Sequence, residues 1–250
     1  MTYRAQVLLE ILESCFGAGG GIPAQKCKYP LTICYIIIWR KKLLKVAGVV
    51  FSARREGNCL RCMEYCLERL REKGFTTTLV NAYDYSIKPC SHCDYECYAS
   101  IIRGRKEKCP TQDDVPKMYK MLKSTDLLLF AVPCYGGHVP ALYRAWNERV
   151  AHIPDETDVL EKFEDFQRMY LNKILGFIII GNLTAGGDMT LHEVLCDFYN
   201  IRQPETILLQ SREYGRISLK GDLVEVPAVK ERLDKFIDLL IKRITERHHE

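Results

Sequence analysis

Residues 46–52 read VAGVVFS, a short apolar run rich in valine that ends in a polar residue. Such a run predicts a strand that is buried on both faces of a sheet. Residues 58–73 follow, with apolar side chains every three or four positions as far as Gly74. This second pattern predicts an amphipathic helix that ends at the glycine. The strand and the helix form the first unit of an alternation that continues along the chain.

A β-branched run at residues 76–80 predicts a second strand, and further runs predict strands at residues 126–132, 174–180 and 206–209. Helical patterns accompany them at residues 114–124, 141–153, 190–200 and 229–247. Strands that alternate with helices and are apolar throughout are typical of a parallel sheet covered on two sides. We therefore predict an α/β fold in which a doubly wound five-stranded parallel sheet, in the order 2-1-3-4-5, carries helices on both faces.

The first 44 residues do not join this alternation. Residues 17–23 read GAGGGIP, which is typical of a flexible joint. We expect residues 1–44 to be an accessory N-terminal extension and residues 45–250 to form the ligand-binding domain. A start codon set too early and an additional helix packed on the domain are both open alternatives for the extension.

The composition is that of a globular protein and argues against two classes of partner. The 250 residues are 47% hydrophobic and 27% charged, with a formal net charge of +4, and no long basic block indicates nucleic-acid binding. The apolar run at residues 31–39 is shorter than the roughly 20 residues that a membrane-spanning helix needs. Residues 1–14 mix charges into their apolar stretch, unlike a secretory signal, so we expect a cytoplasmic protein.

Polar segments that contain glycine follow the first, third and fourth expected strands. Because parallel strands end at the same edge of the sheet, these segments should meet where the strand order reverses, between strands one and three. The first segment, SARREGNC at residues 52–59, leads into a helix whose amino end suits an anion. It is neither a G-x-G-x-x-G motif nor a P-loop, so neither a Rossmann dinucleotide site nor an ATP site follows.

The second segment, PCYGGHVP at residues 133–140, has two adjacent glycines that allow the backbone to approach a flat ligand. Tyr135 could lie against the ring of such a ligand. The third segment, GNLTAGGDMTL at residues 181–191, is a second glycine-bearing loop that opens a helix. Each segment alone is a weak signal, because ordinary strand–helix turns also contain glycine.

The order of these segments resembles the NAD(P)H-dependent FMN reductase family and its iron–sulfur flavoprotein relatives, which are flavodoxin-like. FSARREGNC at residues 51–59 is similar to the family's G-S-P-R-x-x-G-N-T, and PCYGG to its P-x-Y-x-G. Asn-Glu-Arg at residues 147–149 stands where the family has Asp-Arg, and the third segment resembles a Gly-Gly followed by Thr-Leu. Phe51 and Ala53 replace Gly and Pro, and Cys59 replaces a threonine whose hydroxyl would bond the phosphate. The resemblance runs from Val46 to the C-terminus.

The resemblance implies a homodimeric or homotetrameric FMN oxidoreductase that moves electrons from NAD(P)H to a small-molecule or protein acceptor. An iron–sulfur flavoprotein fed by a ferredoxin-like donor is the alternative, and a non-redox binding module on the same fold is a third. No side chain is assigned a catalytic role. The implied FMN contacts are Ser52, Arg54, Gly57, Asn58 and Cys59 to the phosphate, Pro133, Cys134, Tyr135, Gly136 and Gly137 along the ring, and Thr184, Ala185, Gly186 and Gly187 across the pocket.

Four of the twelve cysteines fall in one polar segment after the second strand: Cys90, Cys93, Cys97 and Cys109. Thiolates at such spacing suit an iron–sulfur cluster or zinc. Relatives with a [4Fe–4S] cluster carry C-x2-C-x2-C-x(4–7)-C, and this chain has one more residue before Cys97 and a longer gap to Cys109. A cluster, zinc and no metal therefore all stay open. A second triplet, residues 59, 62 and 66, shares one face of the first helix and is expected in the core.

Overall fold

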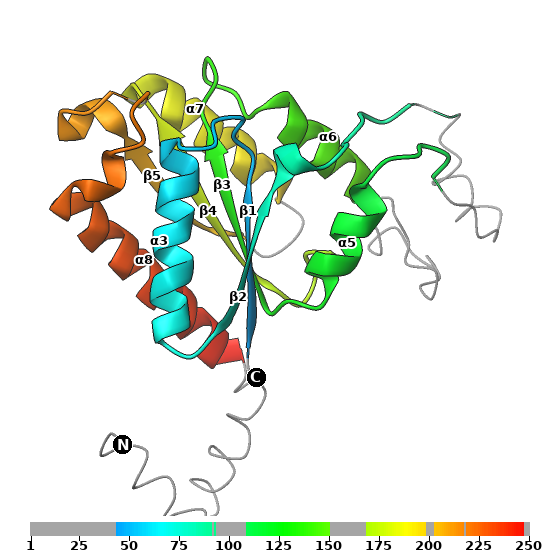
Figure 1. Cartoon of the computed structure of the whole chain (residues 1–250), viewed down its shortest axis with the longest axis horizontal. Coiled ribbons are helices and arrows are strands. Elements are labelled where there is room, and N and C mark those ends of the chain that lie inside the picture. The colour runs from blue at the N-terminus through cyan, green and yellow to red at the C-terminus, as the bar shows by residue number, and fades with distance from the viewer. Residues whose placement is uncertain are drawn as a thin grey trace, which may run out of the picture. The chain divides into compact units, whose positions relative to one another are not determined.

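The computed structural model describes residues 44–91, 93, 109–150, 169–198, 203–217 and 219–247. In this part of the chain, five parallel strands form one sheet with the order β2-β1-β3-β4-β5 (Figure 1). The strands are β1 (Lys45–Val50), β2 (Thr76–Asn81), β3 (Leu127–Pro133), β4 (Ile174–Gly181) and β5 (Glu205–Gln210). The predicted doubly wound sheet and its strand order are confirmed.

Helices cover both faces of this sheet, as Figure 1 shows for α3 and α8 on one side and α5 and α6 on the other. The described helices are α3 (Asn58–Glu72), α5 (Val115–Lys123), α6 (Ala141–Val150), α7 (Thr184–Asp197) and α8 (Pro227–Arg247). Three 3₁₀ turns, which the sequence pattern did not predict, are η2 (Ala82–Asp84), η4 (Ser211–Tyr214) and η5 (Leu223–Glu225). No helix among the described residues is both long and apolar enough to span a bilayer.

Side chains of β1 alternate between the two halves of the core. Val46 and Val50 pack with α3 and α8, whereas Ala47 and Val49 face the side of α5 and α6, as the two-residue repeat of a strand requires. Gly48 lies between them, and a Cβ there would fall 2.4 Å from Sδ of Met63 on α3. This glycine therefore sets how closely the first helix approaches the sheet.

The start of α7 differs from the sequence prediction. The expected glycine loop at residues 181–191 was wrong in extent, because the helix begins at Thr184. A Cβ at Gly187 would lie 2.2 Å from Nε2 of Gln210 on β5, and one at Gly186 would lie 3.2 Å from Sγ of Cys134. The two glycines allow the first turn of α7 to pack closely against its neighbours, and this packing overrides their low helix propensity.

Parts of three expected segments fall outside the described residues. They are residues 1–43 of the expected extension, residues 151–153 of the helix predicted to follow the third strand, and residues 199–200 of the helix predicted to follow the fourth. The division between an accessory extension and a ligand-binding domain therefore stays a prediction.

A buried ion pair joins the end of α6 to the chain on both sides of the cysteine segment. Arg149 is 1% exposed, and its Nη1 and Nη2 donate to the two carboxylate oxygens of Asp113 at 2.7 and 3.2 Å. Nη1 also lies 3.2 Å from the carbonyl oxygen of Lys88, whose own N–H donates to Asp113 at 3.0 Å. Residues before Cys90 and after Cys109 are thus held at one point.

We predict that Arg149→Met lowers the free energy of unfolding by about 3–5 kcal/mol, because it leaves the Asp113 carboxylate buried and unpaired. Equilibrium unfolding in urea measures this loss. Lys235→Met is the matched control, since Lys235 pairs with Glu231 on the exposed face of α8 and its loss should change stability by about 0.5 kcal/mol or less. Similar small losses in both variants would contradict the anchoring role of Arg149.

Candidate functional site

The carboxyl ends of β1, β3 and β4 lie at the upper edge of the sheet in Figure 1. Residues at and after these strand ends line a pocket. It lies beside the point between β1 and β3 where the strand order reverses, the usual ligand position in such sheets. Its lining residues are Ser52, Arg54, Asn58, Cys59, Pro133, Cys134, Ile180, Gly181 and Asn182. Six of these were predicted from the sequence, and the fold brings them together from two separate segments.

The amino end of α3 forms one wall of this pocket. Gly57 is the N-cap residue, no side chain among the described residues caps the helix, and its first turn carries no acidic residue. The backbone N–H groups of a first turn lack partners within the helix, and they carry the positive end of its dipole. This wall is therefore suited to a phosphate or another anion.

Asn58 supplies a buried donor at the same wall. Its side chain is 3% exposed, and its Oδ1 accepts the N–H of Leu223 at 3.1 Å. That bond orients the amide, and Nδ2 is left without a hydrogen-bond partner among the described residues. Burying an unpaired donor costs about 1–3 kcal/mol, so Nδ2 calls for an acceptor from a ligand.

The bracing of this wall by a distant segment was not predicted. Gly221 has φ of +71°, and a Cβ there would fall 2.0 Å from the carbonyl oxygen of Glu56. The N–H of Leu223 then fixes the amide of Asn58. The glycine itself was visible in the sequence, but nothing local showed that it packs on the first segment.

Asn182 offers the opposite chemistry on the β4 side of the pocket, and the sequence prediction missed it. Its Oδ1 is buried and accepts no hydrogen bond from the described residues. A ligand hydroxyl could donate to this oxygen. The pocket therefore combines donors at the α3 end with an acceptor at the β4 end.

The segment after β3 forms a tight turn beside the pocket. The N–H of Tyr135 donates to the carbonyl of His138 at 2.9 Å, and the N–H of His138 donates to the carbonyl of Tyr135 at 3.1 Å. Gly136 and Gly137 have φ of +62° and +90°, the positive values that a type I′ turn requires at both central positions. Tyr135 is 44% exposed and presents its ring at the surface rather than in the pocket lining.

Burial determines the protonation of the cysteines on α3. Cys59 is 3% exposed, and burial raises the pKa of its thiol to about 12, with Arg54 opposing the shift. The thiol is therefore a neutral S–H in the wall that is suited to an anion. Burial also raises the pKa of Cys62 and of Cys66, and both pack in the core as predicted.

The proposed metal ligands are only partly described. Cys90, Cys93 and Cys109 are half-buried free thiols, and Cys97 lies outside the described residues. In the part of the chain that is described, no three Cys, His, Asp or Glu side chains are gathered to hold a metal ion. A site shared by all four cysteines stays a prediction.

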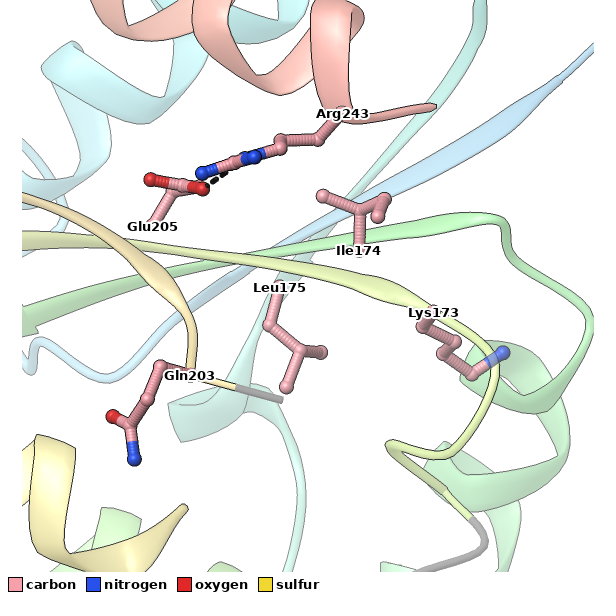
Figure 2. A pocket seen from close by; sticks show the side chains of 6 residues that line it. All are labelled: Lys173, Ile174, Leu175, Gln203, Glu205 and Arg243. Atoms are coloured by element: carbon pink, nitrogen blue, oxygen red, sulfur yellow. Dashed lines mark hydrogen bonds and ion pairs between the residues drawn. The ribbon is translucent and has the colours of Figure 1, made fainter. Parts of the chain in front are cut away.

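A second pocket lies at the opposite edge of the sheet, at the amino ends of β4 and β5 (Figure 2). Burial lowers the pKa of Lys173 to about 8, and its Nζ donates to the carbonyls of Lys123 and Thr125 at 2.6 and 2.7 Å. Arg243 pairs with Glu205 at 2.6 Å across the same pocket. Lys173 and Arg243 already have partners in the protein. This pocket is therefore a weaker candidate for a ligand site than the one beside β1 and β3.

Comparison with known proteins gives relatives of one kind. The chain is 24% identical over 200 residues to an iron–sulfur flavoprotein from Methanosarcina thermophila, covering 79% of this chain and 95% of the relative. It is 27% identical over 158 residues to an iron–sulfur flavoprotein from Methanocaldococcus jannaschii, covering 63% of this chain and 72% of the relative.

Solved structures match the fold. An azoreductase from Bacillus anthracis has a TM-score of 0.54 at 11% identity, covering 80% of this chain and 99% of that one. An NAD(P)H:quinone oxidoreductase from Methanothermobacter marburgensis has a TM-score of 0.51 at 15% identity, covering 67% of this chain and 83% of that one. At these identities the matches establish the flavodoxin-like fold.

The family comparison covers the same part of the chain as the site. Residues 44–203 match the model of the NADPH-dependent FMN reductases, a range that includes both walls of the pocket and the turn after β3. The chain belongs to the NADPH-dependent FMN reductase family of flavodoxin-like oxidoreductases.

Proposed function

We propose that this protein binds FMN noncovalently and acts as an NAD(P)H-dependent oxidoreductase that moves electrons from the nicotinamide to an acceptor. The observation that carries the proposal is the unpartnered Nδ2 of Asn58, buried at the amino end of α3. It lines the pocket at the strand-order reversal. Family membership supports the choice of FMN as the ligand.

The phosphate of FMN fits the α3 wall. Ser52 and Arg54 line the pocket beside Asn58, and hydrogen bonds from charged donors to phosphate are among the stronger ones in proteins. Cys59 fits as well, because burial keeps its thiol neutral and so adds no repulsion to a dianion. The thiol replaces the family's threonine with a weaker donor.

The rest of the ligand fits the other walls. The acceptor of Asn182 complements the hydroxyl groups of a ribityl chain. Cys134 lines the pocket at the end of β3, directly before the turn that carries Tyr135. The bound flavin supplies the electron chemistry, and these residues bind the cofactor and orient its ring. No side chain of the pocket is proposed as an acid or base.

A second candidate function is that of an iron–sulfur flavoprotein taking electrons from a ferredoxin-like donor. It is favoured by four cysteines in one polar segment and by relatives that are named iron–sulfur flavoproteins. The ends of the segment also lie together, since Ser91 Oγ and Thr111 Oγ1 are 3.2 Å apart. Thiolates are suitable ligands for a [4Fe–4S] cluster.

We also propose that the protein is cytoplasmic. We infer in addition that it forms a homodimer or a homotetramer, since closed symmetric assemblies are the most common oligomers. The acceptor is a small molecule or a protein.

The phosphate site is tested with Asn58→Asp. This change keeps the oxygen that accepts the Leu223 N–H, but it replaces the Nδ2 donor with an oxygen. We expect the Kd for FMN to rise about tenfold or more, because a hydrogen bond to a charged group contributes about 1.5–3 kcal/mol. Binding of riboflavin, which has no phosphate, should change much less. Quenching of flavin fluorescence measures both constants.

Asn81→Asp is the matched control for this measurement. Asn81 also caps a turn through its Oδ1, which accepts the Tyr83 N–H at 3.0 Å, but it does not line the pocket. The Kd of the Asn81→Asp variant for FMN should stay at the wild-type value. Wild-type protein that is folded and binds no added FMN would overturn the proposed function.

The cysteine segment is tested with anaerobically purified protein. If the four cysteines hold a [4Fe–4S] cluster, we expect iron and acid-labile sulfide, and Cys93→Ser should lose both while it keeps FMN. Cys196→Ser is the control, because Cys196 is an exposed thiol on α7 outside the segment. Protein with neither iron nor sulfide would contradict the cluster and favour an FMN reductase without one. Zinc in place of iron would indicate a structural site.

The domain division is tested by removing residues 1–42. We expect the shortened protein to bind FMN as the full chain does, because β1 begins at Lys45 and every residue proposed to contact FMN follows it. The flavin content of the purified protein is the measurement. An insoluble or flavin-free product would show that the extension belongs to the folded core.

A further inference from the structure

A carboxylate on α7 holds the backbone next to the turn after β3. Oε2 of Glu193 accepts the N–H of Val139 at 2.9 Å, and Val139 directly follows His138, the last residue of the turn. Val139 is 6% exposed, so its N–H has little access to water as an alternative partner. Oε1 of Glu193 accepts Nε of Arg144 on α6 at 2.9 Å.

Two more residues of α7 contact the same segment. A Cβ at Gly137 would lie 3.0 Å from Sδ of Met189, and one at Gly186 would lie 3.2 Å from Sγ of Cys134. Residues 186, 189 and 193 are spaced by three and four, so they share one face of the helix. This face of α7 therefore runs along the whole connection from Cys134 to Val139.

We propose that Glu193 is a positioning residue for the flavin: it fixes the turn at Tyr135–His138, and with it the tightness of FMN binding and the reduction potential of the bound flavin. The inference rests on the proposed function, together with the expectation from the family resemblance that the segment from Pro133 to Gly137 lies along the flavin ring. Glu193 acts through the backbone of Val139 and not by contact with the reacting atoms.

The charge of Glu193 supports this role. Burial opposes ionisation, but hydrogen bonds from Arg144 and from the Val139 N–H hold the pKa of the carboxyl below its usual range. Nδ1 of His138 lies 3.7 Å from Oε2 and favours the ionised form further when it is protonated. The acceptor for Val139 is thus a carboxylate at neutral pH, and hydrogen bonds to charged acceptors are stronger than those to neutral ones.

Asp197 provides an internal comparison. It lies one turn after Glu193 and shares Arg144, whose Nη1 donates to its Oδ1 at 2.6 Å. Its other partner is the hydroxyl of Tyr143 at 3.1 Å. Both partners are on α6, so Asp197 joins the two helices without a hydrogen bond to the turn.

The experiment compares Glu193→Ala, Glu193→Gln and Asp197→Asn with the wild type. We expect Glu193→Ala to raise the Kd for FMN about tenfold and to shift the reduction potential of the bound flavin. Glu193→Gln keeps an oxygen for the Val139 N–H and should recover most of the binding. Asp197→Asn should lower the melting temperature of the flavin-free protein but leave the Kd and the potential unchanged. Fluorescence titration, a redox titration against reference dyes and thermal unfolding provide these readouts.

Two outcomes overturn the inference while FMN binding stands. One is a wild-type Kd and potential in Glu193→Ala. The other is equal weakening by Asp197→Asn, which would make the effect one of helix packing. If Glu193→Ala does not fold, Glu193→Gln provides the test. A Kd and a reduction potential far from the wild-type values in that variant would contradict the role assigned to the acceptor oxygen. Wild-type protein that binds no FMN would instead overturn the proposed function, and this inference with it.

Discussion

All five strands of the described sheet run in the same direction, and this constraint determines where every part of the site can be. The strand ends and the amino ends of the following helices meet at one edge, where unpaired N–H groups collect. The reversal of strand order between β1 and β3 separates the helices on the two faces and leaves room for a ligand. More than 70 residues of sequence separate Cys134 from Ser52 and Asn58. Only this topology brings the three side chains to one pocket.

The sequence was sufficient for the architecture, because the central strands β1, β3 and β4 are buried on both faces and read as uninterrupted apolar runs. The β4 run ILGFIII is buried at every position, and no alternative pattern competes with a strand there. The same local reasoning failed at Gly186 and Gly187. Glycines in sequence indicate a loop, but here they allow α7 to start close to Gln210 and Cys134, a packing constraint that appears only once the sheet has formed.

The site was predictable where its residues follow a strand in an expected motif, as Asn58 and Cys134 do. It was not predictable where a distant segment completes it. Leu223 orients the amide of Asn58 from 165 residues away, and Glu193 reaches Val139 from 54 residues away. Neither contact leaves a local signal, since a backbone N–H is present at every residue except proline. Asn182 was missed because the sequence analysis placed the ligand contacts of this segment at residues 184–187, around the two glycines.

Cys59 stands where the family has a threonine, and its burial has a consequence for the reactivity of its thiol. Oxidants attack the thiolate form of cysteine far more readily than the thiol. With its pKa raised to about 12 by burial, the Cys59 side chain is a neutral thiol at pH 7. A flavoprotein is exposed to peroxide whenever its reduced cofactor meets oxygen, and this sulfur lines the pocket proposed to hold the FMN phosphate. Burial thus keeps Cys59 in its neutral thiol form, although Arg54 and Ser52 act to lower its pKa.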